Sequence, residues 1–339
     1  DPAMVGSNGV ISQIPMAVTN PNIGILYVLA ITSMGVYGIT LAGWSSNNKW
    51  SLLGGIRASA QMVSYEITLS LAILSIILIS GSLNLYDIIE TQRGGFWNWN
   101  ILAAPVAFIL FVIAMFAETN RLPFDLAEAE AELTGGFHTE YSSMRFALFF
   151  LGEYVNMVIV AGMCTTLFLG GFYGPIQIET IPLAVFNGGW DGLASQMSQI
   201  PSIITILASY LLGPMVIFPA KISFFIFLFI FARATLPRLR YDQLMSLGWK
   251  KLLPIGLINL VLTAIAVAID LVYRAGLPGG LESNQHMTLA AKLILGFVTL
   301  ALFLGWDLLV FSPKRRRQLT TEYQNLERGP DHPAQALAQ

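Results

Sequence analysis

The chain has 339 residues, of which 55% are hydrophobic and only 11% are charged, and its formal net charge is −2. Soluble domains carry roughly 25% charged residues, so this chain has too little charge to cover a water-soluble globule of its length. The composition therefore excludes a soluble binding module, and the nearly balanced charge does not point to nucleic acid as a partner.

Seven apolar segments follow one another along the chain, and each is long enough to cross a bilayer as a helix. They cover residues 23–44, 67–84, 101–117, 146–171, 202–235, 252–273 and 289–311. We therefore predict an all-α fold, a polytopic transmembrane helix bundle with about seven spans in residues 23–311.

The fifth segment is unusual because it is longer than one span requires. It contains the dipeptide Gly213-Pro214 and also Pro219, and proline inside a helix removes a backbone hydrogen bond. The distribution of positive charge requires an odd number of crossings here. We therefore predict one true span near residues 220–235, preceded by a helix that lies at the outer face of the membrane.

Lysine and arginine gather in alternate connections, and this pattern predicts the orientation of the bundle. Most of the 18 Lys and Arg lie in the loops 45–66, 118–145 and 236–251 and in the C-terminal tail. Because positively charged loops stay in the cytoplasm, we predict that these loops and the basic tail 312–339 are cytoplasmic. Residues 1–22 then form a periplasmic stretch, and the polar tail has a composition typical of disorder.

The stretch from Ala117 to Phe146 concentrates acidic residues between two apolar segments. Its sequence is AETNRLPFDLAEAEAELTGGFHTEYSSMRF, and it holds six of the chain's 20 Asp and Glu. Pro123 predicts the end of the preceding helix. Asp125 and Glu128 have the spacing of a capping box, which predicts a short helix after the proline. A solvated, well-capped loop helix would explain this pattern equally well.

Charged residues also lie inside the apolar segments. Glu153 is about two turns into the fourth segment, and Glu66 precedes the second. A carboxylate inside a span costs about 2.5–3.5 kcal/mol on insertion scales, so it usually faces a polar cavity and marks a functional path. For Glu66 the structural alternative is a carboxylate at the membrane surface. Lys221 and Lys292 are expected to extend their ammonium groups towards that surface.

The sequence predicts no metal centre on this chain. Its one cysteine, Cys164, lies in an apolar segment and is expected to be a buried thiol. The three histidines, His138, His286 and His332, all lie outside the apolar segments. A haem held by two histidines within the membrane, an iron–sulfur cluster or a zinc site of cysteine and histidine is therefore not expected.

Longer motifs make the sequence resemble a known family. The motifs are ETNRLPFDLAEAEAELTGGFHTEYSSMRFALFFLGEY (118–154), GWSSNNKWSLLGGIRASAQMVSYE (43–66), GSLNLYDI (81–88) and RATLPRLRYDQLMSLGWKKLLP (233–254). They closely resemble the signature of the quinone-site membrane subunit of proton-pumping NADH–quinone oxidoreductase (respiratory complex I), which bacteria name the H subunit. The resemblance covers roughly residues 20–275.

This resemblance implies a function within a larger complex. The subunit would form much of a quinone-binding chamber and would couple quinone reduction to proton translocation through buried carboxylates. Quinone would be the substrate, and NADH, FMN and the iron–sulfur clusters would belong to partner subunits. The expected partners are the hydrophilic-arm subunits at the quinone site, adjacent small membrane subunits and lipid, and the expected location is the bacterial inner membrane.

The resemblance also implies roles for individual residues. As proton-path carboxylates it implies Glu66, Glu128, Glu130, Glu132 and Glu153. As residues of the quinone chamber or of the docking surface it implies Arg57, Arg121, Phe124, Asp125, His138, Arg238, Arg240 and Asp242. For Arg238 and Arg240, anchoring at the cytoplasmic face is an equally good explanation. For Phe124, packing is the more common role of such an aromatic ring.

Two further interpretations remain open. The chain could be a stand-alone ion transporter, or a structural or ion-translocating subunit of a related membrane-bound hydrogenase. The family also has an N-terminal helix, an amphipathic segment and a second helix that are not present before Asp1. We therefore expect an N-terminally incomplete chain, with nine spans in the full-length protein. The apolar stretch 202–220 looks like an insertion relative to the family.

Overall fold

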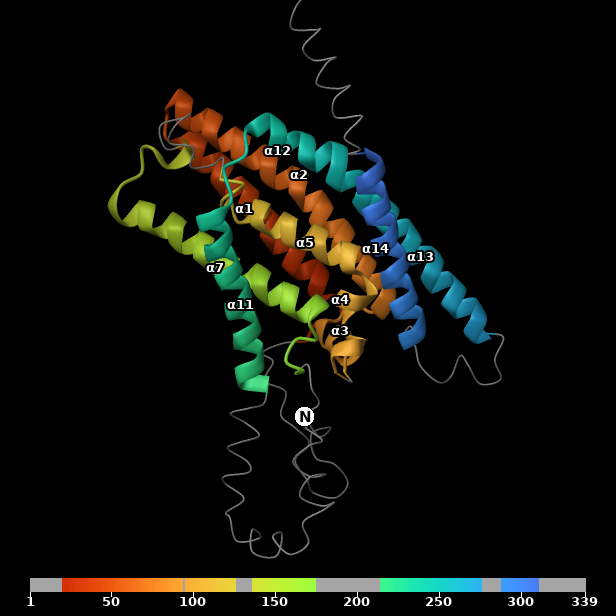
Figure 1. Ribbon diagram of the computed structural model, residues 1–339. Coiled ribbons are helices and arrows are strands. Elements are labelled where there is room, and N and C mark those ends of the chain that lie inside the picture. The colour runs from red at the N-terminus through yellow and green to blue at the C-terminus, as the bar shows by residue number, and fades with distance from the viewer. Residues whose placement is uncertain (1–19, 94, 126–135, 175–213, 276–287, 311–339) are drawn as a thin grey trace, which may run out of the picture.

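The computed structural model describes residues 20–93, 95–125, 136–174, 214–275 and 288–310 (Figure 1). Every regular element in these ranges is a helix, which confirms the predicted all-α class. Five helical stretches are long and apolar enough to cross a membrane. They are α1 (Gly24–Ser45), α2 (Lys49–Ser80), α7 (Ser143–Phe168), α11 (Pro214–Thr235) and the continuous stretch Tyr241–Tyr273.

Two further apolar helices, α5 (Pro105–Glu118) and α14 (Leu289–Val310), lie at the third and seventh predicted segments. All seven predicted segments therefore contain a helix, and the chain is a multi-pass membrane protein. α11 begins at Pro214, somewhat before the predicted span 220–235. The predicted outer-face helix before it and the tail 312–339 lie outside the described residues.

The first two helices form a hairpin with a tight turn. Asn47 has a positive φ of 50°, a conformation that asparagine tolerates better than most residues. Asn48 is the N-cap of α2, and its side chain accepts a hydrogen bond from the backbone N–H of Trp50 at 3.0 Å. The helices approach closely at Gly43 and Gly55, where a Cβ atom on Gly43 would lie 2.8 Å from the carbonyl oxygen of Ser51.

The predicted loop 45–66 is wrong in its structure, because the chain is helical from Lys49 onwards. α2 has 32 residues, so it is about 48 Å long and exceeds the roughly 30 Å hydrocarbon core. Its polar first half contains no proline, and nothing in it stops the helix. Arg57 and the small polar residues lower the hydropathy there, and a hydropathy pattern alone does not separate a polar helix from a loop.

The predicted loop 236–251 is corrected in the same way. Its second half is the helix α12 (Tyr241–Leu247), which continues through the π-helical turn η4 (Gly248–Leu252) into α13 (Leu253–Ala275). Gly248 lies where this turn meets α2, and a Cβ atom there would be 3.5 Å from the ring of Tyr65. In Figure 1, α12 lies along the upper end of α2.

The third apolar segment is a broken helix. The short α4 (Asn100–Ala103) ends at Ala104, and α5 begins at Pro105. Proline suits the first position of a helix because its missing N–H is not needed there, but it gives Ile101 no donor. α14 covers this break closely, since a Cβ atom on Gly296 would lie 1.8 Å from the carbonyl oxygen of Leu102.

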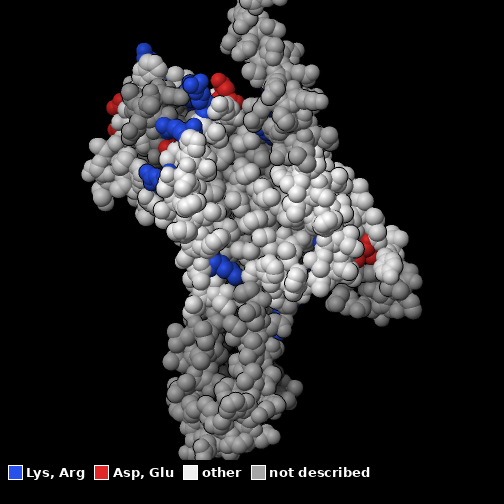
Figure 2. Space-filling model, viewed as in Figure 1, with Lys and Arg blue, Asp and Glu red and all other residues white. Residues whose placement is uncertain are grey.

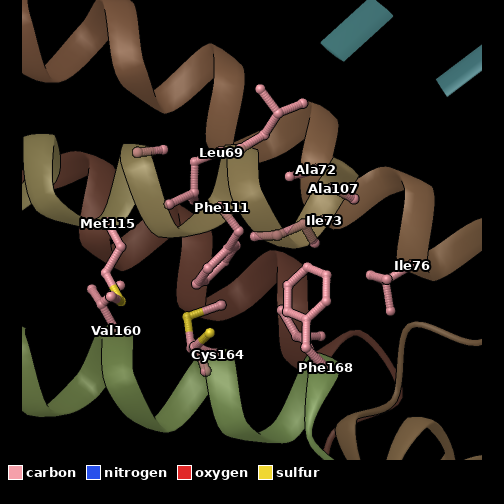
Figure 3. Close-up of a cluster of buried hydrophobic side chains, with 14 of the residues drawn as sticks. Leu69, Ala72, Ile73, Ile76, Ala107, Phe111, Met115, Val160, Cys164 and Phe168 are labelled. Carbon is pink, nitrogen blue, oxygen red and sulfur yellow. The ribbon is translucent and has the colours of Figure 1, made fainter. Parts of the chain in front are cut away.

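The core lies between α2, α5 and α7 (Figure 3). Apolar side chains from the three helices point towards one another, and small residues among the large ones let the helices pack closely. The labelled residues are Leu69, Ala72, Ile73, Ile76, Ala107, Phe111, Met115, Val160, Cys164 and Phe168. The rings of Phe111 and Phe168 have centroids 5.4 Å apart. Cys164 is fully buried, as predicted.

The lower end of the bundle in Figure 1 carries the short helices α3 (Leu85–Glu90), η2 (Phe96–Asn98) and α4. Lys292 is only 4% exposed, and its ammonium group donates to the carbonyl oxygen of Thr91 at 3.3 Å. The prediction that Lys292 reaches the membrane surface is therefore wrong. A backbone carbonyl at the end of α3 is available inside the bundle and replaces water as the acceptor.

Charged side chains gather at the opposite end. Figure 2 shows them over the upper left of this face, while the middle of the face is almost entirely uncharged. The turn after α1 and the connections after α5 and α11 meet at this end, since Asn48 donates to Glu140 at 2.7 Å and Arg238 contacts Asp125 at 3.4 Å. The three predicted positive regions thus share one end. Its cytoplasmic location stays a prediction.

The α1–α2 crossing allows a matched test. Alanine has a helix propensity about 1 kcal/mol better than glycine, so Gly38→Ala should keep or raise stability, because no described atom lies within 4 Å of its Cβ position. Gly43→Ala should instead destabilise the chain by about 1–3 kcal/mol, because the helices must separate. The measurement is the thermal midpoint of each variant in its membrane complex. A Gly43→Ala midpoint equal to that of Gly38→Ala would contradict the proposed close contact.

Candidate functional site

Residues 118–125 connect the end of α5 to three other parts of the bundle, and we name them the junction turn. α5 ends at Glu118, and Asn120 reverses the chain with a positive φ of 48°. The turn is closed by a hydrogen bond from the N–H of Phe124 to the carbonyl of Arg121 at 2.8 Å. The N–H of Leu239 donates to the carbonyl of Pro123 at 3.2 Å, so the chain before α12 lies against the turn.

Gln61 of α2 fixes the junction turn from the inside. This side chain is fully buried, and its amide nitrogen donates to the carbonyls of Ala117 at 2.9 Å and Phe124 at 2.8 Å. It also lies 3.3 Å from the side-chain oxygen of Asn120. One amide therefore binds both ends of the turn, where unpaired carbonyls would be costly.

The first charged contact of the junction turn joins it to α7. Arg121 and Glu153 form an ion pair with 3.4 Å between Nη2 and Oε2, and their side chains are only 7% and 15% exposed. The guanidinium also lies over the ring of Tyr154, 4.7 Å from its centroid. The structure thus brings together two residues that were predicted for different roles.

The guanidinium of Arg121 has donors that are not used by the described residues. Its Nε and Nη2 atoms are buried, and neither donates a hydrogen bond to any part of the chain that the structure describes. A buried donor without a partner is rare in proteins. The arrangement can therefore accept a polar group, such as a carbonyl oxygen or a water molecule, beside the ion pair.

The second charged contact joins the junction turn to the chain before α12. Arg238 forms an ion pair with Asp125 at 3.4 Å. The same guanidinium donates through Nε to the backbone carbonyl of Asp125 at 2.9 Å and through Nη2 to the same oxygen. Arg238 therefore holds both the side chain and the backbone of Asp125, a planar and charge-assisted contact that lysine could not reproduce.

The third charged contact is between two carboxylates. Glu66 lies in the middle of α2, and its charge acts on Glu118 at the end of α5. On its other side Glu66 lines an open groove on the surface of α2 with Val63, Ile67, Ser70, Leu71 and Leu74. Two acidic groups in electrostatic contact do not both ionise easily, and such pairs share protons.

α12 packs over α2 beside the junction turn. The guanidinium of Arg57 lies over the ring of Tyr241, 5.7 Å from its centroid. Tyr65 is fully buried and donates to the carbonyl of Leu244 at 3.0 Å, and its ring meets Phe124 edge-on at 5.4 Å. Phe124 is 5% exposed, so the structure places it in the packed interior.

The remaining predicted residues lie around this centre. Arg240 and Asp242 are exposed at the start of α12, on a surface open to other molecules. His138 lies in the short helix η3 (Gly136–His138), where its ring contacts Phe146 at 5.4 Å. Glu128, Glu130 and Glu132, with the predicted capping-box helix, lie outside the described residues.

Sequence reasoning did not identify Gln61 or Tyr65. Both interrupt the first half of α2, a stretch interpreted as a loop, and their polar atoms are buried against the junction turn and α12. The detectable signal was their spacing: Gln61 and Tyr65 are four residues apart, so they share one face once this stretch is helical.

Comparisons with known proteins agree with the resemblance of the motifs. The family described as NADH dehydrogenase matches residues 3–264 of the chain. The chain is 49% identical over 250 residues to an NADH-quinone oxidoreductase H protein of Koribacter versatilis. It is 46% identical over 284 residues to the corresponding H protein of Solibacter usitatus, and 48% identical over 257 residues to "NADH-quinone oxidoreductase subunit 8" of Rhodothermus marinus.

These alignments cover 73%, 75% and 75% of this chain and 64%, 71% and 70% of the three relatives. The chain therefore spans somewhat under two thirds of the Koribacter protein. The matched region contains α1, α2, α5, α7 and α11 and the whole junction turn. The chain belongs to the NADH dehydrogenase family, whose members include the H subunits of NADH-quinone oxidoreductases.

Proposed function

We propose that this chain is the membrane subunit of a proton-translocating NADH–quinone oxidoreductase in a bacterial inner membrane. In this proposal the junction turn borders the quinone chamber, and buried carboxylates couple quinone reduction to proton movement. The observation that carries the proposal is the buried Arg121–Glu153 pair with unused guanidinium donors. The chain provides no redox cofactor in this proposal, and partner subunits supply NADH, FMN and iron–sulfur clusters.

The guanidinium of Arg121 fits the carbonyl chemistry of a quinone. A quinone offers two carbonyl oxygens as acceptors, and reduction places negative charge on them before two protons are taken up. A fixed cation with free N–H donors in a poorly hydrated site stabilises such developing charge. Tyr154, which lies against the same guanidinium, gives the pocket an aromatic wall.

The carboxylates supply the proton chemistry of the proposal. Glu153 contacts Arg121 directly, so a change of charge at the quinone alters the strength of this ion pair. Glu118 begins the same junction turn and interacts with Glu66 inside the bundle. Protonation of one carboxylate weakens its repulsion of the next, and this coupling can move a proton from the turn towards the groove on α2.

Exposed residues on α12 suit the docking of partner subunits. Arg240 and Asp242 lie at the end of the bundle that also carries the junction turn, and Arg238 attaches this segment to the turn. A partner bound here would lie next to the proposed chamber. Its redox centre could then be close to the quinone.

A Glu153→Gln variant of the full-length chain tests the coupling role. Glutamine keeps the shape of the side chain but cannot carry the charge or the proton, so NADH:quinone reduction and proton pumping should fall by about ten- to a hundredfold. NADH:ferricyanide reduction needs only the hydrophilic arm and should be unchanged. Both activities are measured in the same membranes.

The matched control is Glu140→Gln, which removes an exposed carboxylate at the same end of the bundle. It should keep most of the quinone reductase activity. If Glu153→Gln retained both quinone reduction and pumping, Glu153 would be a tolerated structural residue and the proton-path part of the proposal would fail.

A double-mutant cycle tests the ion pair itself. Removing one member of a low-exposure pair leaves the other charge without its counter-ion, which costs about 3–5 kcal/mol. Arg121→Gln should therefore lower the thermal midpoint of the chain in its complex. The double variant Arg121→Gln/Glu153→Gln should be more stable than Arg121→Gln alone, because no buried charge remains at the pair.

The coupling energy from the four midpoints should lie in the range of about 0.5–3 kcal/mol that contacting residues show. Strictly additive effects would mean that the two side chains do not interact in the assembled protein. The buried pair could then not link quinone chemistry to Glu153.

A further inference from the structure

At the end of the bundle opposite the junction turn, a lysine of α11 points into the chain that leaves α7. The ammonium group of Lys221 donates to three backbone carbonyls, those of Leu169 at 2.5 Å, Gly171 at 2.9 Å and Tyr173 at 2.6 Å. An ammonium group has three donors, so each N–H has one acceptor. This stretch contributes no carboxylate to these contacts.

Two consecutive glycines bring these carbonyls together. Gly170 and Gly171 have φ values of 70° and 53°, in the left-handed region that favours glycine. Neither position has room for a side chain, because a Cβ atom would lie 2.7 Å from Nε1 of Trp99 at Gly170 and 2.9 Å from Ile89 at Gly171. The chain is therefore held in a tight curl, with its carbonyl oxygens directed at one point.

The electrostatic surroundings also favour a cation at this point. The carboxyl end of a helix is the negative end of its dipole, and α7 ends at Phe168, next to the carbonyls. The indole ring of Trp99 lies on another side of the ammonium group, with Nζ 4.5 Å from the ring. Aromatic faces attract cations most strongly where water is scarce.

The other polar groups at the end of α7 already have partners. Gln92 donates to the carbonyl of Thr166 at 3.0 Å and accepts from the N–H of Gly170 at 2.9 Å, and Asn100 donates to the carbonyl of Leu167 at 3.0 Å. The phenol of Tyr173 donates to Glu90 at 2.5 Å, and burial together with this contact raises the pKa of Tyr173. The three carbonyls around Lys221 thus form a separate site.

We propose that this curl is a site for a monovalent cation and that the Lys221 ammonium group fills it as a tethered ligand. The contact connects α11 to the end of α7 and fixes the position of α7 along its axis. Glu153 lies nearer the other end of the same helix, so Lys221 acts as a positioning residue. The cation site itself does not depend on the proposed function.

Chemical rescue tests the site. Lys221→Ala removes three methylene groups and the ammonium group, which n-propylammonium replaces. We expect the thermal midpoint of the full-length variant, measured in its membrane complex, to fall by roughly 5 °C. Added n-propylammonium chloride should restore much of this loss in a saturable way, and wild type should not respond. Tetramethylammonium chloride at equal concentration has no N–H donor and should have no such effect.

Two results would overturn the proposal. One is a Lys221→Ala midpoint equal to that of wild type, and the other is an equal response to both ammonium salts. If Lys221→Ala does not accumulate in membranes, Lys221→Met and Lys221→Arg decide the question. Accumulation of the arginine variant alone supports a cation site, whereas equal accumulation of the methionine variant shows that the side chain only fills space.

The readout is heat stability, so it separates this inference from the proposed function. Loss of the cation site would leave the quinone activity of wild type unexplained but intact. Failure of the Glu153→Gln experiment would leave the carbonyl site in place.

Discussion

The contact between the Arg121 guanidinium and the Glu153 carboxylate is the constraint on which the charged end of the bundle depends. A bilayer provides no water to solvate either group, so each needs the other or another polar group nearby. The pair joins the junction turn to α7, while Arg238 holds Asp125 at the end of the same turn. Eight consecutive residues, 118–125, thereby connect α5 to α2, α7 and the chain before α12.

The two ends of the bundle solve the same problem with different chemistry. At the junction turn, side-chain charges meet side-chain charges, and their balance changes whenever a proton is gained or lost. At the opposite end, the ammonium groups of Lys221 and Lys292 meet backbone carbonyls, which cannot titrate. One end is therefore electrically adjustable, and the other is fixed. This difference suits a helix bundle that must respond to chemistry at one face without losing its architecture at the other.

The sequence predicted the helix class, the seven apolar segments and the grouping of the positive regions, because hydropathy and lysine–arginine distribution are properties of the chain alone. It predicted Glu153 as a special residue because a carboxylate inside a span needs a reason. It did not predict the partner Arg121, which lies 32 residues away in the sequence and meets Glu153 only through packing. It also misjudged 49–66 and 241–251, because a polar helix without breakers resembles a loop in a hydropathy pattern.

The break between α4 and α5 gives α14 a role as electrical insulation. Pro105 cannot donate to Ile101, and the backbone at the break is less well paired than in a continuous helix. Each unpaired backbone group facing hydrocarbon costs several kcal/mol. Gly296 allows α14 to lie directly against the carbonyl of Leu102, so the dipoles at the break face a protein wall instead of lipid. Any side chain at residue 296 would lift this cover, and the defect would then be felt by the membrane itself.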